Sequence, residues 1–124
     1  MPHLSLIYSS NVDEKVEARV LFGELHQALM ELEAFELLDF KSRTMMQSNY
    51  HIGDGAENRA FVHLDVAVMA GRDVSVRQRV VQVCLRVLNA YFAGSAGKVD
   101  LQLSVELREM DRATYAKQRG GATA

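Results

Sequence analysis

Pro2 is the residue whose chemistry depends most on its place in this sequence, because it directly follows the initiator methionine. If Met1 is removed, Pro2 carries a free secondary amine on a rigid ring. The α-amine of a chain terminus has a pKa of about 7.7 to 8.0, and apolar burial lowers it by disfavouring the charged form. Such an amine can act as a general base near neutral pH. If Met1 stays attached, Pro2 is an amide that simply begins a strand, a position where proline is tolerated.

Three cations could accompany such a base. Lys41 and Arg43 alternate within a predicted strand over residues 38–46, so they share one of its faces. Arg72 follows Gly71, where a second predicted strand ends. Cations beside a base could hold carboxylates and the charge that develops during a reaction. Judged by themselves, Lys41 and Arg43 fit equally well as two solvated cations on an exposed strand.

The other reactive side chains indicate no second chemistry. Cys84 is the single cysteine and lies in an apolar helical pattern, which predicts a small buried hydrophobe. No histidines, cysteines and carboxylates occur together with the spacing of metal ligands, so no metal is expected. His63 and Asp65 share a strand face and are predicted to form a hydrogen-bonded pair in a pocket or subunit contact. His26 is predicted to be a solvated surface residue.

Length and charge limit the class of protein. The 124 residues, with a net charge of −2, fit a single domain over 1–124 that does not bind nucleic acid. The amino terminus has no basic leader, and no apolar stretch reaches the roughly 18 residues of a membrane span, so a cytoplasmic protein is expected. Residues 111–124 are predicted to be a polar, partly frayed tail.

The predicted elements alternate strand, helix, strand twice. The first helix is expected to begin near Val12 or Asp13, because Asn11 and Glu14 have the form of a helix-start signal. The other expected elements are a strand over 4–8, a strand over 38–46, a loop over 47–58, a strand over 60–69, a helix over 74–93 and a strand over 101–108. The two halves, about 2–46 and 60–109, read as a structural repeat.

This repeat predicts an α+β fold. Two right-handed β-α-β units build a four-stranded mixed sheet with both helices on one face. The other sheet face then carries apolar side chains such as Met45 and Phe61, which makes an oligomer plausible.

Five short motifs, considered together with their order along the chain, are informative. They are Met1-Pro2-His3, Lys41-Ser42-Arg43, Gly53-Asp54-Gly55, Ala60-Phe61-Val62-His63 and Gly71-Arg72. From Pro2 to about Glu109, their order and spacing resemble the 5-carboxymethyl-2-hydroxymuconate isomerase family of the tautomerase superfamily. The resemblance implies the same sheet arrangement, a homotrimer in which the uncovered sheet faces meet, and catalysis without metal or cofactor.

The resemblance also implies a substrate and site residues. The family ketonises 5-carboxymethyl-2-hydroxymuconate, a small anionic tricarboxylate from the homoprotocatechuate pathway of aromatic compound catabolism. Pro2 matches the family's base, Arg72 a substrate-binding arginine and Lys41 a second cationic position. Close relatives carry arginine at the Lys41 position, and lysine offers a point charge in place of a bidentate fork. Arg43 faces the same way and could fill that role instead.

A different class of function also fits the elements. A noncatalytic oligomeric α+β module that binds a small ligand would use Pro2 only to start a strand. This alternative explains the fold, but it does not explain why the terminal proline, the strand cations and Gly71-Arg72 occur together.

Overall fold

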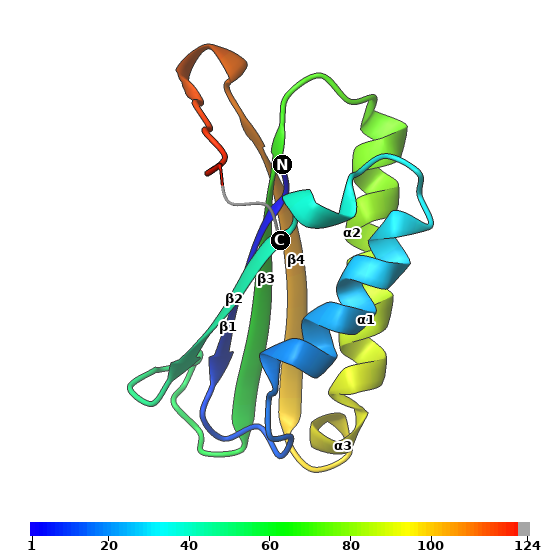
Figure 1. Cartoon of the computed structure of the whole chain (residues 1–124). Coiled ribbons are helices and arrows are strands. Elements are labelled where there is room, and N and C mark those ends of the chain that lie inside the picture. The colour runs from blue at the N-terminus through cyan, green and yellow to red at the C-terminus, as the bar shows by residue number, and fades with distance from the viewer. Residues whose placement is uncertain (122–124) are drawn as a thin grey trace.

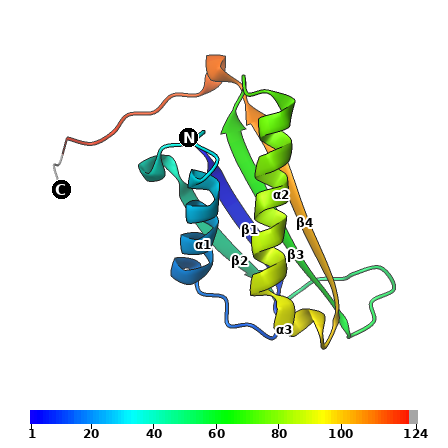
Figure 2. The same cartoon turned by 90° about the vertical axis from the view of Figure 1, so that its right-hand side faces the viewer.

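The computed structural model describes residues 1–121, which form one mixed four-stranded sheet covered on one face by two long helices (Figures 1 and 2). The strand order is β2-β1-β3-β4; β1 pairs with β2 and β3 with β4 in parallel, whereas β1 and β3 are antiparallel. The elements are β1 (His3–Ser9), α1 (Ala18–Met30), η1 (Leu37–Asp39), β2 (Lys41–Gln47), β3 (Arg59–Met69), α2 (Val74–Tyr91), α3 (Ala93–Ala96), β4 (Asp100–Met110) and η2 (Arg112–Thr114). The predicted α+β fold of two β-α-β units is confirmed.

The core lies between the sheet and the two helices. Alternate residues of the central strands β1 and β3 point into it and are fully buried, as the alternation in the sequence predicted for β3. The helices contribute apolar side chains at three- and four-residue spacing. The fully buried members of the core include Leu4, Leu6, Val62, Leu64, Val66, Val68, Leu21, Leu25, Leu29, Val80, Cys84, Leu88 and Phe92.

The predicted start of the first helix is wrong. Helix α1 begins at Ala18, five to six residues later than Val12 or Asp13. The Asn11 amide donates to the carbonyl oxygens of Glu57 and Arg59, and the Glu14 carboxylate accepts hydrogen bonds from Ser95. Both side chains of the expected cap therefore form hydrogen bonds to residues that are distant in the sequence, and neither caps a helix.

The start of the second strand and the environment of His26 also differ from the prediction. Residues 37–39 form a 3₁₀ turn, and strand β2 begins at Lys41. His26 is half-buried; its ring stacks on Phe40 with a centroid distance of 4.6 Å, and its Nε2 lies 2.6 Å from Ser42 Oγ. Because Phe40 and Ser42 face the helices, His26 joins α1 to β2 and is not a solvated surface residue.

We expect His26 to make the fold sensitive to mild acid. Burial lowers the pKa of His26 in the folded protein, so the unfolded chain binds the proton more readily. Its contribution to stability is present above the ordinary histidine pKa of about 6.5 and is lost as the pH falls through the lowered value. Thermal unfolding at pH 7.5 and pH 5 should therefore give a smaller difference in Tm for His26→Gln than for the wild type. An equal difference in both proteins would contradict this role.

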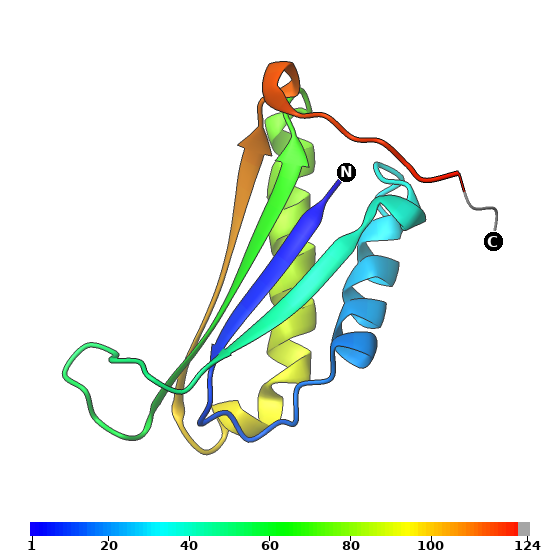
Figure 3. The same ribbon diagram turned by 60° about the vertical axis from the view of Figure 1, so that its left-hand side comes forward.

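The second face of the sheet carries no helix, and Figure 3 looks onto it with the four strands in front. Met45 is 56% exposed there. The predicted hydrogen bond between His63 and Asp65 is not formed. His63 Nδ1 lies 2.7 Å from Ser104 Oγ, and Asp65 accepts two hydrogen bonds from Arg108, at 2.8 and 2.6 Å. His63 therefore pairs with the residue directly opposite it on β4, whereas Asp65 pairs diagonally with Arg108, whose long side chain reaches past Glu106, the residue opposite Asp65.

Among residues 1–121, no helix is both long and apolar enough to cross a membrane.

Candidate functional site

Pro2 is buried at the head of β1, next to the start of β2. Its carbonyl oxygen accepts a hydrogen bond from the Lys41 backbone N–H at 3.1 Å. The β1–β2 register then places His3 beside Lys41. The base predicted from the sequence and one of its predicted cations therefore meet at the same end of the sheet.

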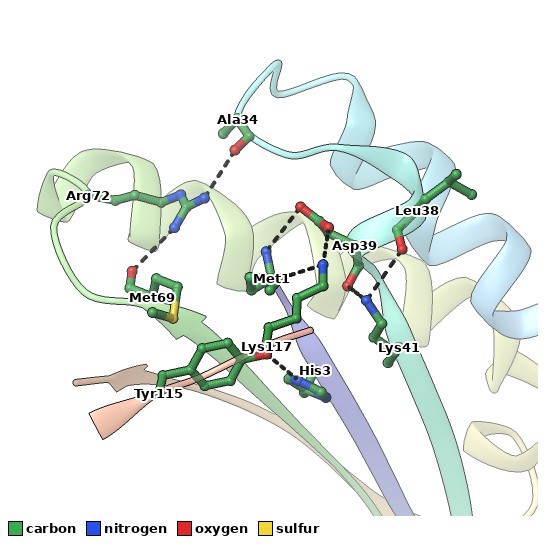
Figure 4. A network of polar contacts seen from close by, with 10 residues as sticks. All are labelled: Met1, His3, Ala34, Leu38, Asp39, Lys41, Met69, Arg72, Tyr115 and Lys117. Carbon is green, nitrogen blue, oxygen red and sulfur yellow. Dashed lines mark hydrogen bonds and ion pairs between the residues drawn. The ribbon is translucent and has the colours of Figure 1, made fainter. Parts of the chain in front are cut away.

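The chain terminus lies in a polar cluster at this end of the sheet, which Figure 4 shows. With Met1 attached, the terminal nitrogen belongs to Met1 and lies 3.6 Å from the Asp39 carboxylate. Burial lowers the pKa of this amine, and the positive charges of Arg72 and Lys117 lower it further, whereas Asp39 raises it. The net effect is a lowered pKa, which favours a neutral amine.

Arg72 is held by backbone carbonyl groups. Its Nη1 donates to Met69 O and its Nη2 to Ala34 O, each at 3.2 Å, and its guanidinium stacks 4.7 Å from the centre of the Phe35 ring. The turn after β3 needs Gly71, whose φ of 120° is unfavourable for residues with a side chain. Carbonyl oxygens orient a guanidinium without neutralising its charge, and Arg72 has no salt bridge within residues 1–121.

Lys41 and Arg43 share the uncovered sheet face, as predicted, but they occupy different places. The Lys41 ammonium donates to the carbonyl oxygens of Leu38 and Asp39, at 3.4 and 3.2 Å, beside the terminus. Arg43 lies further along β2; it donates to Ser5 Oγ, and its Nη2 is 3.1 Å from His3 Nδ1. The geometry thus brings Lys41 to the site directly and Arg43 only through His3.

A cavity of about 460 Å³ lies at this position. His3, Asp39 and Lys41 form one side of it, while the other side comes from the chain after β4, which includes Tyr115 and Lys117. A larger hollow, of about 600 Å³, lies between α1 and α2 and shares no lining residue with it. The smaller cavity is the one that adjoins the buried terminus.

The sequence interpretation did not identify three residues of this site. Asp39 falls in the predicted strand over 38–46, and Tyr115 and Lys117 fall in the predicted polar tail over 111–124. Lys117 Nζ lies 2.9 Å from Asp39 Oδ1, and the Tyr115 hydroxyl lies 3.4 Å from His3 Nε2. An aromatic residue and a lysine inside an otherwise small and polar tail were the available signal, but nothing local to the tail indicates what it contacts.

The other predicted reactive groups lie elsewhere. Cys84 is fully buried in the core, and this burial raises the pKa of its thiol to about 12, so it is an inert hydrophobe as predicted. In the part of the chain that the structure describes, no three histidines, cysteines or carboxylates are grouped so that they could hold a metal ion.

The arrangement suits proton transfer on an anionic molecule. A partly buried terminal amine with a lowered pKa supplies a base, and the nearby cations Arg72, Lys41 and Lys117 supply partners for carboxylates.

Comparisons with known proteins agree on one family. The family model for 5-carboxymethyl-2-hydroxymuconate isomerase matches residues 2–120. The Escherichia coli 5-carboxymethyl-2-hydroxymuconate Delta-isomerase is 27% identical over 118 residues, which cover 95% of this chain and 94% of that protein. The crystal structure of a 5-carboxymethyl-2-hydroxymuconate isomerase from Deinococcus radiodurans R1 is 30% identical, with a TM-score of 0.88 over 96% of this chain and 90% of that one.

A more distant structure shows the likeness of fold alone. It is described as a fused 4-OT wild-type symmetric trimer and is 15% identical, with a TM-score of 0.75 over 95% of this chain and 93% of that one.

Proposed function

Because the chain belongs to the 5-carboxymethyl-2-hydroxymuconate isomerase family, as its motifs predicted, and is therefore an enzyme, we propose the reaction that it catalyses. The reaction is the cofactor-free keto–enol tautomerisation of 5-carboxymethyl-2-hydroxymuconate or a closely related 2-hydroxydienoate. The observation that carries this proposal is the partly buried chain terminus, whose amine has a lowered pKa and lies beside a cationic cavity.

Pro2 is the proposed base once Met1 has been removed. Removal exposes the ring nitrogen of a residue that is already buried and is held through its carbonyl by Lys41 N–H. The surroundings that lower the pKa of the Met1 amine lie next to this nitrogen, so we expect them to lower the pKa of the proline amine as well, which favours its neutral form. It takes the proton of the 2-hydroxyl group and returns it to a carbon of the conjugated chain.

Arg72 and Lys41 are the proposed partners of the substrate carboxylates. Both have donors directed by backbone carbonyls and keep their charge, so they are organised before substrate binds. They also stabilise the negative charge that spreads over the conjugated system when the hydroxyl proton leaves. Neither Arg72 nor Arg43 lines the cavity, but the charge of Arg72 acts on the terminal amine, whereas Arg43 contacts His3. Arg43 is therefore assigned a supporting role through His3.

The direct test follows the ultraviolet absorbance of the conjugated dienol during conversion to the enone. We expect turnover of 5-carboxymethyl-2-hydroxymuconate that a metal chelator leaves unchanged. If the wild type, with Met1 removed, turns over none of a panel of 2-hydroxydienoates, the alternative gains support: a noncatalytic oligomer that binds a small anion. In that alternative Pro2 only begins strand β1 and never acts as a base.

The proposed assembly is a homotrimer built through the uncovered sheet face. That face carries Met45, Phe61 and the β3–β4 polar pairs, and it has no helix over it (Figure 3). Light scattering at dilute concentration should give the mass of three chains. Met45→Glu places a charge on the face and should shift the mass towards one chain, whereas Val20→Glu, at a residue of α1 that is 47% exposed, should not. A wild type that is stable as a monomer would contradict the assembly.

A further inference from the structure

The chain after β4 folds back across the end of the sheet that holds Pro2. From η2 it passes above the starts of β1 and β2, which Figure 3 shows from the uncovered side. Two side chains hold the segment in this position: the Tyr115 hydroxyl contacts His3, and the Lys117 ammonium pairs with Asp39. A segment distant in sequence thus forms a wall of the cavity beside the proposed base.

Met1 marks the space that a substrate must enter. Its carbonyl carbon is bonded to the Pro2 nitrogen, so the volume that Met1 occupies is the volume next to the proposed base. Lys117 Nζ lies 3.2 Å from the Met1 sulfur, at the edge of that volume (Figure 4). When Met1 is removed, the Lys117 ammonium faces any molecule that approaches the Pro2 amine.

The Lys117 ammonium has N–H donors that can bind such a molecule. An ammonium group has three N–H donors, and one of these is directed to Asp39 Oδ1 at 2.9 Å. The Lys117 side chain is 34% exposed and that of Asp39 29%, and partly exposed ion pairs are weak, so a substrate carboxylate can compete for the ammonium. Arg119 and Lys41 line the same cavity, and among residues 1–121 Asp39 is the single carboxylate that lines it, so the charge of these lining residues is positive.

We propose that Lys117 is a substrate-binding residue of the Pro2 site, where its ammonium pairs with a carboxylate of the anionic substrate. This inference rests on the proposed function, since it assumes that a polycarboxylate binds beside Pro2. It adds a further cation to the two proposed carboxylate partners, Arg72 and Lys41. The carboxyl-terminal segment then takes part in substrate specificity.

The test compares Lys117→Met with Lys98→Met, both with Met1 removed and confirmed by intact mass. Lys98 is a matched control, because it also forms an exposed lysine–aspartate pair, 3.0 Å from Asp13, and it does not line the cavity. Calorimetry with propane-1,2,3-tricarboxylate, which does not react, should show about fivefold to tenfold weaker binding for Lys117→Met. The KM for the dienol should rise by a similar factor with kcat within about twofold, and Lys98→Met should match the wild type.

Lys117→Arg keeps the charge and should restore most of the affinity, which separates a lost carboxylate partner from a disturbed segment. The inference is overturned if Lys117→Met binds as tightly as Lys98→Met, if arginine fails to restore binding, or if the wild type does not bind the tricarboxylate. If the wild type binds it through Lys117 but turns over no dienol, the proposed reaction fails while Lys117 stands as an anion-binding residue.

Discussion

Removal of Met1 is expected to raise turnover by about 10² to 10⁴, the usual contribution of a general base. Protein that retains Met1 has an amide at Pro2, which cannot accept a proton at neutral pH. Such protein can be prepared from cells in which methionine aminopeptidase is inhibited. Treatment with the purified peptidase should then produce activity in the same sample, in step with the loss of one methionine by mass spectrometry.

The same sample incubated with an inactive peptidase is the control, because the sequence and the fold are unchanged. Binding of propane-1,2,3-tricarboxylate before and after cleavage reports separately whether Met1 also blocks the cavity. Equal turnover at equal substrate saturation, with and without Met1, would show that the terminal amine is not the base.

Arg72→Ala is expected to lower kcat/KM by about tenfold to a hundredfold. The charge-assisted hydrogen bonds of Arg72 to a carboxylate are worth roughly 1.5 to 3 kcal/mol, and the substrate would lose them in both the bound state and the transition state. Steady-state kinetics on 5-carboxymethyl-2-hydroxymuconate measure the loss. Arg72→Lys should recover only part of it, because lysine lacks the planar fork.

Arg72 also binds the carbonyl oxygens of Met69 and Ala34, so its removal has a structural cost that must be separated from the chemical one. Arg77→Ala provides the comparison, since Arg77 donates to the Arg72 carbonyl at 3.2 Å and its loss disturbs the same turn. We expect both variants to lower Tm and only Arg72→Ala to lower kcat/KM strongly. Equal kinetic losses would assign Arg72 a structural role.

The sequence alone was sufficient for the order of the strands and for their faces, although not for the start of β2. Val62, Leu64 and Val66 alternate with polar or small residues, and a strand turns alternate side chains to opposite faces, so the buried face of β3 follows from spacing. The same rule placed Lys41 and Arg43 on the uncovered face. These inferences succeed because each depends on residues that are close together in the chain.

The start of α1 could not be predicted in this way. Asn11 and Glu14 have the residue types and the spacing of a helix cap, but Asn11 bonds to Glu57 and Arg59 where β3 begins, and Glu14 bonds to Ser95. His26 differs for the same reason, because its partners Phe40 and Ser42 come from the next strand. A local pattern competes with tertiary partners, and only the assembled fold shows which of them a side chain contacts.

Some residues of the candidate site could likewise be predicted from the sequence, and others could not. The sequence by itself determined its first members, because Pro2, Lys41 and Arg72 occur in a family order that resembles known isomerases, and the comparisons bear out that family. Only the tertiary structure brought Asp39, Tyr115 and Lys117 to Pro2. Lys117 is 78 residues from Asp39, and their pairing depends on the path of the chain after β4. Periodicity records which face of an element is buried, whereas the contacts between distant segments are decided when the elements pack.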